Sequence, residues 1–208
     1  PRGPGDRTGG VSDHVTVIPV FDEVATIGDL VARAASHGTV IVVDDGSADG
    51  SAEAAAEAGA IVLRTQGRRG KGGALRVGFG EALFRGAQRV VTLDGDGQHD
   101  PDDIPRLLAA SADDPGALVI GSRLADGGAS MEPARLNALR VASFFIDWLT
   151  GWGVGDTQSG FRVYPRALLE AVIPRRGGFV LETEMLERAT VAGFTIREVP
   201  LSPGRAAS

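Results

Sequence analysis

The stretch VVTLDGDGQHDPDDIP, residues 90–105, places five aspartates within ten positions directly after an apolar run. Asp94 and Asp96 stand two residues apart, with Gly95 between them. Like charges that lie close together repel, and burial increases that cost. Side chains two apart on a strand point the same way, so at a strand end both carboxylates can face one point. A divalent cation would offset the repulsion, and Mg²⁺ or Mn²⁺ suits oxygen ligands.

A magnesium ion in a protein is typically held by one or two carboxylates, and substrate phosphates complete its ligand shell. The pair Asp94 and Asp96 therefore predicts a phosphate-bearing ligand as well as a cation. The later aspartates, 100, 102 and 103, fit a solvated turn and the first turn of a helix. Two aspartates separated by one residue also occur often by chance, so the pair needs support from other segments.

A second acidic pair, Asp44 and Asp45, follows the β-branched run at 39–43. A basic segment, GRRGKGG at 67–73, supplies Arg68, Arg69 and Lys71 among glycines. Glycines let the backbone approach an anion, and the N-terminus of a following helix adds partial positive charge. The segment lacks the spacing and the Ser or Thr of a Walker A motif. Its alternative interpretation is a basic surface loop.

Strands and helices are predicted to alternate along the first 122 residues. The expected strands span 14–20, 39–43, 60–64, 89–93 and 116–122. The expected helices span 24–38, 47–59, 71–86 and 101–111. Alternating elements with continuous apolar strands are typical of a mostly parallel sheet with helices on both faces. Ligands bind such sheets beyond the carboxyl ends of the strands, where both acidic pairs are expected.

The second half of the chain is less regular. We expect a Gly-rich loop at 125–133, a long apolar helix at 134–151, and helices around RALLEAV and LETEMLERATVAG. A last strand is expected in TIREVPL. The predicted architecture is a single α/β domain over 13–208, divided into halves at 13–123 and 124–208, after a disordered lead-in at 1–12.

Composition narrows the function classes. The 208 residues carry a formal net charge of −6, so no nucleic-acid partner is expected. Cysteine is absent, which excludes disulfides and thiolate metal sites and is compatible with a reducing cytoplasm. We find no apolar run of the ~18 residues that a membrane-spanning helix needs. The first ten residues lack the apolar core of a signal peptide, and the predicted location is cytoplasmic.

Several segments taken together resemble a known family. In chain order they are VIPVFDEVATIGDLV, IVVDDGSADGS, GRRGKGGALRVGF, LDGDGQHDPDDIP, GSR, DTQSGFRVYP and LETEM. This series resembles the family 2 glycosyltransferases of the GT-A fold. It is most similar to the branch of dolichol- and polyprenyl-phosphate mannosyl- or glucosyltransferases, and the likeness runs from about residue 15 to 200. DTQSGFR carries the similarity to that branch.

The resemblance implies metal-dependent, inverting transfer of a hexose. The donor would be a nucleotide diphosphate sugar, GDP-mannose or UDP-glucose, bound by the half at 13–123. The acceptor, a polyprenyl or dolichyl phosphate, would bind the half at 124–208. Asp94, Asp96 and Gln98 would hold Mg²⁺ or Mn²⁺ against the donor diphosphate, where the cation acts as a Lewis acid.

The resemblance also assigns donor-binding residues, and every number given is that of this chain. They are Pro19, Phe21, Glu23, Asp44, Asp45, Lys71 and Gly95. Phe21 would stack on the base, Glu23 would bind base or ribose, and one of the two aspartates would bond the base. The family usually has Asn where this chain has Asp22, which leaves the preferred base open.

On the acceptor side, Asp156 and Gln158 would orient the sugar or the acceptor, and Arg123 and Arg205 would contact the acceptor phosphate. Glu184 and Glu182 are candidates for sugar hydroxyls. Further arginines near the proposed site are Arg135, Arg140 and Arg162. A phosphate acceptor is already anionic and needs no base. The alternative is a family 2 enzyme with a soluble hydroxyl acceptor, for which Asp156 or Glu184 would be the base.

Residues 136–152 are rich in large apolar side chains and predict a peripheral membrane contact that brings the enzyme to a lipid acceptor. The same segment also fits packing on the sheet or in a homodimer. Two other protein classes fit less well. A phosphoacceptor receiver would be shorter, with a Lys after its fifth strand, and a nucleotidyltransferase would carry a Gly-rich signature near its N-terminus.

Overall fold

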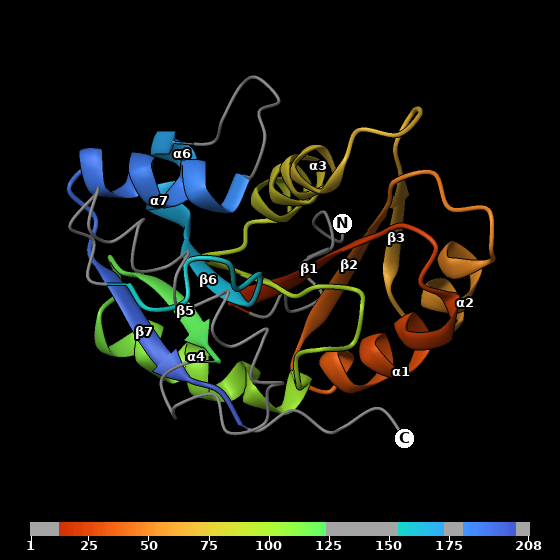
Figure 1. Cartoon of the computed structure of the whole chain (residues 1–208), viewed down its shortest axis with the longest axis horizontal. Helices are drawn as coiled ribbons and strands as arrows, with labels where there is room; N and C mark the ends of the chain where they lie inside the picture. Colours follow the sequence, from red (N-terminus) through yellow and green to blue (C-terminus); the bar gives the residue numbers. More distant parts are fainter. Residues whose placement is uncertain (1–12, 124–153, 173–180, 203–208) are drawn as a thin grey trace, which may run out of the picture.

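The computed structural model describes residues 13–123, 154–172 and 181–202. Within them, seven strands form one sheet in the order β3-β2-β1-β4-β6-β5-β7 (Figure 1). The strands are β1 (His14–Val20), β2 (Thr39–Asp44), β3 (Ile61–Arg64), β4 (Arg89–Thr92), β5 (Leu118–Ser122), β6 (Arg162–Pro165) and β7 (Ile196–Pro200). All neighbours pair in parallel except β6, which is antiparallel to both β4 and β5. The predicted α/β fold with a mostly parallel sheet is confirmed.

Helices cover both faces of this sheet. They are α1 (Val24–Ala35), α2 (Ser51–Glu57), α3 (Lys71–Phe84), the short 3₁₀ helix η1 (Pro101–Asp103), α4 (Ile104–Asp113), α6 (Arg166–Val172) and α7 (Leu181–Val191). Helices α3, α6 and α7 pack on one face, and α1, α2 and α4 pack on the other (Figure 1). Each face therefore has its own hydrophobic layer.

The central strand β1 shows why the sequence folds in this way. Every residue of β1 is buried. Val15 and Val17 belong to the layer under α3, whereas Ile18 and Val20 belong to the layer under α1. A strand covered on both faces must be apolar on both sides, which is why its sequence reads as a continuous hydrophobic run.

The sequence analysis missed one strand and misplaced several ends. Strand β6 was not predicted, because RVYP is four residues long, begins with Arg and ends with Pro. The helix expected at 47–59 covers only Ser51–Glu57, since residues 46–50 form a loop that begins and ends with left-handed glycines. The helix expected at 101–111 starts as η1 and continues as α4 to Asp113.

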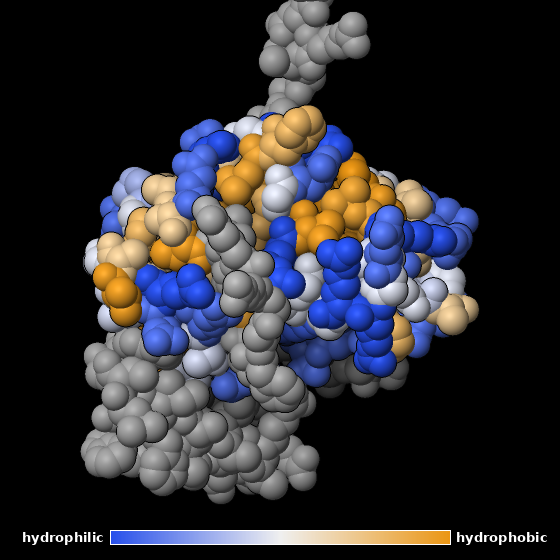
Figure 2. All heavy atoms as spheres, turned by 90° about the horizontal axis from the view of Figure 1, so that it is seen from above, coloured by the Kyte–Doolittle hydropathy of each residue, from blue (hydrophilic) through white to orange (hydrophobic). Residues whose placement is uncertain are grey.

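Some predictions fall outside the described residues. These are the lead-in at 1–12, the loop at 125–133, the helix at 134–151 and the membrane contact at 136–152. Among the residues that the structure does describe, no helix is long and apolar enough to span a bilayer. Figure 2 views the face of α3, α6 and α7, where hydrophobic groups of side chains lie between hydrophilic ones. Phe84 and Val191 are 86% and 84% exposed, but single exposed apolar residues are normal on surfaces. The homodimer stays a prediction.

The chain order in the sheet determines where a ligand can bind. The chain runs outward from β1 through β2 to β3, then crosses back to β4 on the other side of β1. The loops that leave β1 and β4 therefore diverge and open a crevice beyond the carboxyl ends of the two strands. The segments that follow these strands are residues 21–23 and 93–100, which contain the predicted donor residues Phe21 and Glu23 and the acidic pair Asp94 and Asp96.

Candidate active site

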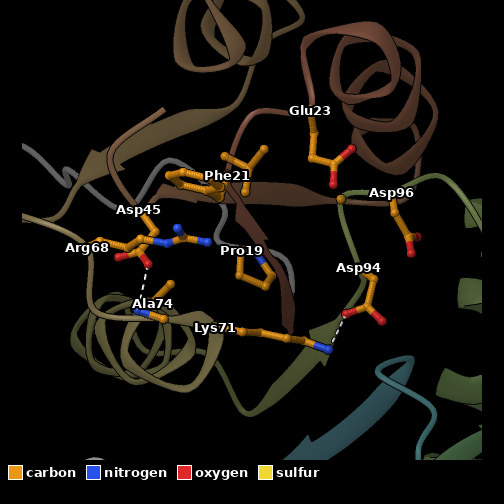
Figure 3. Close-up of a pocket in the computed structure, with 12 residues that line it drawn as sticks. Pro19, Phe21, Glu23, Asp45, Arg68, Lys71, Ala74, Asp94 and Asp96 are labelled. Atoms are coloured by element: carbon orange, nitrogen blue, oxygen red, sulfur yellow. Dashed lines mark hydrogen bonds and ion pairs between the residues drawn. The ribbon is translucent and has the colours of Figure 1, made fainter. Parts of the chain in front are cut away.

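A pocket lies at this crevice, between the ends of β1 and β4 and the start of α3 (Figure 3). Its lining consists of Pro19, Val20, Phe21, Glu23, Asp45, Arg68, Gly70, Lys71, Ala74, Asp94, Gly95 and Asp96. In Figure 3 the carboxylates of Glu23, Asp96 and Asp94 follow one side, and Phe21, Arg68 and Asp45 lie on the other. The structure thus brings most of the predicted donor residues together.

Asp94 is held on one of its carboxylate oxygens and faces a buried histidine with the other. Lys71 Nζ lies 2.7 Å from Oδ1, and the buried His99 lies with Nε2 3.9 Å from Oδ2. The backbone behind the carboxylate is Gly160, where an added Cβ would stand 2.4 Å from both oxygens. Only glycine leaves room for Asp94 at this point. Burial lowers the pKa of His99, although the charge of Asp94 opposes that effect.

Asp96 stands in the turn after β4 rather than on the strand. Its carboxylate accepts hydrogen bonds from the backbone nitrogen of Gln98 (3.0 Å) and from the Gln98 amide nitrogen (2.6 Å). A cation would instead require the amide oxygen of Gln98. Asp94 and Asp96 face the pocket because the turn at Gly95 packs closely on β1, with an added Cβ at 3.1 Å from the Pro19 carbonyl oxygen.

The carboxylate oxygens of Asp94 and Asp96 fit a hard divalent cation whose remaining ligands come from a bound substrate. Burial, followed by the negative charges of Asp96, Asp49 and Asp22, raises the pKa of Glu23. The pocket therefore concentrates negative charge beside Asp94 and Asp96. No group of three or more His, Asp or Glu residues within the described ranges is arranged to hold a metal unaided. Two carboxylates with substrate phosphates are the usual shell of Mg²⁺.

Lys71 joins the pocket to α7, which lies in the predicted acceptor-side half of the chain. Besides Asp94, its ammonium contacts Oε1 of Glu182 at 2.6 Å. Lys71 is the first residue of α3, and Glu182 lies in the first turn of α7. Burial disfavours the charge of Lys71, but Asp94 and Glu182 together raise its pKa. The side chain is therefore a permanent cation at neutral pH.

Asp45 fixes the basic loop at 67–70. Its Oδ1 accepts from the Thr65 hydroxyl (2.9 Å) and the Arg69 backbone nitrogen (2.8 Å), and its Oδ2 accepts from the Gly70 nitrogen (2.6 Å). The predicted contact to a base would have to use the remaining acceptor capacity of this carboxylate.

The Arg68 guanidinium stacks on Phe21. It lies 3.8 Å from the centre of the ring, so it covers one face of that ring.

Asp44 and Asp22 organise the loops around the pocket and do not line it. Asp44 is buried, and its Oδ1 accepts from the Ser47 nitrogen at 2.9 Å. Asp22 has a left-handed backbone with φ of 54° and accepts from the Ala48 nitrogen at 2.9 Å. Asn and Asp are the residues that tolerate this conformation best. The departure from the family pattern at this position is therefore compatible with the same loop.

On the acceptor side, the two predicted catalytic residues Arg123 and Asp156 pair with each other. Arg123 donates from Nε at 2.9 Å, from Nη2 at 3.1 Å and from its backbone nitrogen at 3.1 Å. Asp156 is fully buried, and Glu198 accepts from its backbone nitrogen at 2.7 Å. Burial opposes the charge of Arg123, but Asp156, Asp94 and Asp96 raise its pKa. The guanidinium therefore lies in the field of the acidic pair.

One arginine near the proposed site is a buried structural residue. Arg162 is 0% exposed and donates to three backbone carbonyls, those of Ser159, Glu182 and Thr157, each at 2.8 Å. Arg162, one of the further arginines near the proposed site, is therefore bound to these carbonyls and is not available to an acceptor phosphate. Its role is to join the DTQSGF segment to the start of α7.

Gln158 and Glu184 are not among the residues that line the pocket. Gln158 is exposed, next to the buried Asp156 and Thr157. Glu184 forms an ion pair with Arg188, one turn further along α7, at 2.8 Å. Arg205, Arg135 and Arg140 fall outside the described residues. On α7 it is Glu182, not Glu184, that contacts the ammonium of Lys71 in the pocket.

Sequence reasoning gave no role to His99, Thr65 or Glu198. His99 is part of the motif DGDGQH, but the sequence analysis gave it no role. The side chain is only 4% exposed, and that burial cannot be inferred from its polar neighbours in the sequence. Thr65 and Glu198 act on residues 20 and 42 positions away, Asp45 and Asp156. Such long-range bonds leave no local pattern in the sequence.

The family described as Glycosyl transferase family 2 matches residues 16–173 of this chain. The polyprenol monophosphomannose synthase of Mycolicibacterium smegmatis is 31% identical, over 96% of this chain and 84% of that protein. The undecaprenyl-phosphate mannosyltransferase of Micrococcus luteus is 32% identical, over 90% of this chain and 82% of that protein. A solved structure of glucosyl-3-phosphoglycerate synthase from Mycobacterium tuberculosis, in complex with Mg²⁺ and UDP, superimposes with a TM-score of 0.75 at 22% identity. That superposition covers 97% of this chain and 74% of the other.

Proposed function

The chain belongs to the family 2 glycosyltransferases, and from this premise we propose that it transfers a hexose from a nucleotide diphosphate sugar to a polyprenyl monophosphate. The transfer inverts the anomeric centre and depends on a divalent cation. Two similar proteins, each about 30% identical and matched over most of their length, are named for mannosyl transfer to polyprenyl phosphates. Their names support a lipid phosphate as the acceptor.

The pairing of the candidate bases is the observation that carries this proposal. A hydroxyl acceptor needs a carboxylate that can take its proton. Asp156 is fully buried, and both of its oxygens accept from Arg123. Glu184 is paired with Arg188. Asp156 presents no vacant oxygen to an acceptor, and Glu184 shares its Oε1 with Arg188, which favours an acceptor that arrives already deprotonated.

A phosphate acceptor fits this site in its charge as well. A phosphate monoester is a dianion above its second pKa, near 6. One of its oxygens attacks the anomeric carbon, the bond from that carbon to the donor diphosphate breaks, and no proton has to move. Arg123, held by Asp156, supplies positive charge beside the acidic pair and would position the incoming phosphate.

For the donor, we propose that the nucleotide lies across the pocket of Figure 3. The base would lie near Phe21 and Arg68, and the diphosphate near Lys71. Asp94 and Asp96 would hold Mg²⁺ or Mn²⁺, with Gln98 after its amide turns. When bound, that cation stabilises the charge of the leaving diphosphate. The sugar is mannose or glucose, and the donor GDP-mannose or UDP-glucose.

The test compares acceptors that differ only in the phosphate. Purified protein is given GDP-mannose or UDP-glucose, with Mg²⁺ or Mn²⁺, and either a short-chain polyprenyl phosphate or the matching polyprenyl alcohol. We expect a glycosylated product from the phosphate alone, and complete loss of it in EDTA. Product from the alcohol and not from the phosphate would contradict the proposal. Turnover of a soluble hydroxyl acceptor, with neither lipid used, would favour the alternative function.

A further inference from the structure

The ammonium of Lys71 contacts a carboxylate oxygen of Asp94 that a bound divalent cation would need as a ligand. Its ammonium lies 2.7 Å from Oδ1 of Asp94, one of the two carboxylates that face the pocket. The other oxygen of Asp94 faces His99, with Nε2 at 3.9 Å. A divalent cation that binds Asp94 through Oδ1 must therefore displace this ammonium or share the oxygen with it. Two cations on one oxygen repel each other.

Glu182 gives the displaced ammonium a second partner. It contacts Lys71 Nζ at 2.6 Å, and its side chain is only 10% exposed. Because Glu182 and Asp94 come from different segments, the ammonium can leave Asp94 and stay bound to Glu182. Lys71 also stands at the start of α3, next to Gly70, on the wall of the pocket. A diphosphate in that pocket would offer it a further anionic partner.

We propose that Lys71 makes binding of the divalent cation conditional on the nucleotide diphosphate. Without donor, its ammonium neutralises Asp94 and weakens cation binding. With a diphosphate in the pocket, the ammonium turns from Asp94 to the phosphates and to Glu182, and Asp94 is released to the cation. Cation and nucleotide then bind as a pair, which rests on the donor site of the proposed function.

The test measures binding and not activity. Free Mn²⁺ is titrated by electron paramagnetic resonance against wild type, Lys71→Met and the matched control Arg85→Met, which removes a cation from the far end of the same helix. Each protein is titrated three times: without nucleotide, in the presence of UDP, and in the presence of GDP. For Lys71→Met we expect Mn²⁺ alone to bind more tightly, by about tenfold, within the usual range of coupling between sites. The increase in Mn²⁺ affinity caused by the nucleotide should shrink, and the control should match wild type.

Glu182→Gln tests the second partner. With Glu182 neutral, Lys71 keeps only Asp94, so Mn²⁺ alone should bind more weakly than to wild type. In the double variant with Lys71→Met, that weakening should largely disappear, because the effect acts through the ammonium. An equal weakening in both backgrounds would show that Glu182 acts on the cation directly and would overturn its role as a partner for Lys71.

The outcomes separate this inference from the function on which it rests. If wild type binds Mn²⁺ with UDP or GDP, and Lys71→Met neither tightens Mn²⁺ alone nor reduces the effect of the nucleotide, the inference is wrong and the proposed function stands. If wild type binds no Mn²⁺ under any condition, both the inference and the metal assignment fail. Circular dichroism of each variant identifies a loss of fold before any titration is interpreted.

Discussion

At the scale of the residue, Asp156 distinguishes the two acceptor chemistries. An essential general base contributes about 10²–10⁴ in rate and sets the acidic side of the pH profile. A carboxylate that only holds Arg123 does neither. Its two oxygens both point at that guanidinium, and Glu198 fixes the backbone behind it. The two roles therefore predict different pH profiles for one conservative substitution.

For Asp156→Asn we expect kcat/KM with a lipid phosphate to fall by less than about 100-fold, the low end of a lost base. The rise of kcat/KM with pH should keep its midpoint near 6, because it follows the second ionisation of the acceptor phosphate. A pH series from 5 to 8 with the polyprenyl phosphate measures this directly. Asp113→Asn, at an exposed position, is the control. Loss of the acidic limb in the Asp156 variant would assign the base role to Asp156.

Residue types and spacing predicted which acids would come together in one pocket, but not what those acids contact in this structure. DGD after an apolar run was enough to place Asp94 and Asp96 at a strand end, and DDGS did the same for Asp45. The partners were not predictable, because Lys71 is 23 positions from Asp94 and 111 from Glu182. The choice between Glu182 and Glu184 depends on how α7 is rotated, which the sequence of that helix alone does not determine.

At the scale of the element, the loop at 67–70 owes its shape to a residue at the end of β2, from which α2 and β3 separate it along the chain. Asp45, directly after β2, accepts hydrogen bonds from two backbone nitrogens of that loop. The loop leads into α3 and sets the position of Lys71. A substitution at Asp45 should therefore alter nucleotide binding through the loop, even if Asp45 makes no contact with the base.

Asp45→Asn replaces one acceptor oxygen with a donor that faces a backbone N–H. We expect the loop to open more readily by about 1–3 kcal/mol, the cost of an unmatched buried hydrogen-bonding group, or roughly 5- to 150-fold. Trypsin should then cut faster after Arg68 and Arg69, and nucleotide affinity should fall by a similar factor. Asp49→Asn, which caps a different loop, is the control. Unchanged cleavage with weaker nucleotide binding would point instead to direct contact with the base.

Strand β6 shows the limit of local pattern at this scale. Its hydrophobic content resembles that of a loop, and it pairs in the sheet because Arg162 is satisfied by carbonyls of Ser159, Thr157 and Glu182. A buried guanidinium is costly without such partners. The residues that satisfy it come partly from α7, so only the assembled fold explains why an arginine begins a buried strand.

At the scale of the whole molecule, the alternation of strands and helices was sufficient to predict the sheet class and most element positions. It did not predict the strand order, because the insertion of β6 between β4 and β5 has no signal in local sequence.

Stability also depends on a group far from the pocket. His14 begins β1, and burial, followed by the charge of Arg89, lowers its pKa from 6.5.

A histidine kept neutral in the folded state binds its proton more readily after unfolding. The stabilising contribution of His14 is therefore complete above pH 6.5 and is lost as the pH falls toward its folded pKa. The slope is at most about 1.4 kcal/mol per pH unit for one proton. We expect the free energy of unfolding in urea to fall less steeply between pH 7 and 5 in His14→Gln than in wild type. Above pH 7 the two slopes should match, and equal slopes at acid pH would exclude His14.

The position of β6 has a consequence for how the chain is synthesised. Strands β1 to β4 lie side by side and can assemble once residue 92 has left the ribosome. Strand β5 ends at Ser122, yet the partner that joins it to β4 ends at Pro165. A nascent chain therefore carries the outer edge of β4 and both edges of β5 unpaired through the synthesis of some forty further residues, and such edges are templates for wrong pairing. The predicted acceptor motif DTQSGFR lies directly before and within the start of β6, so the predicted donor residues can come together before that motif has been made.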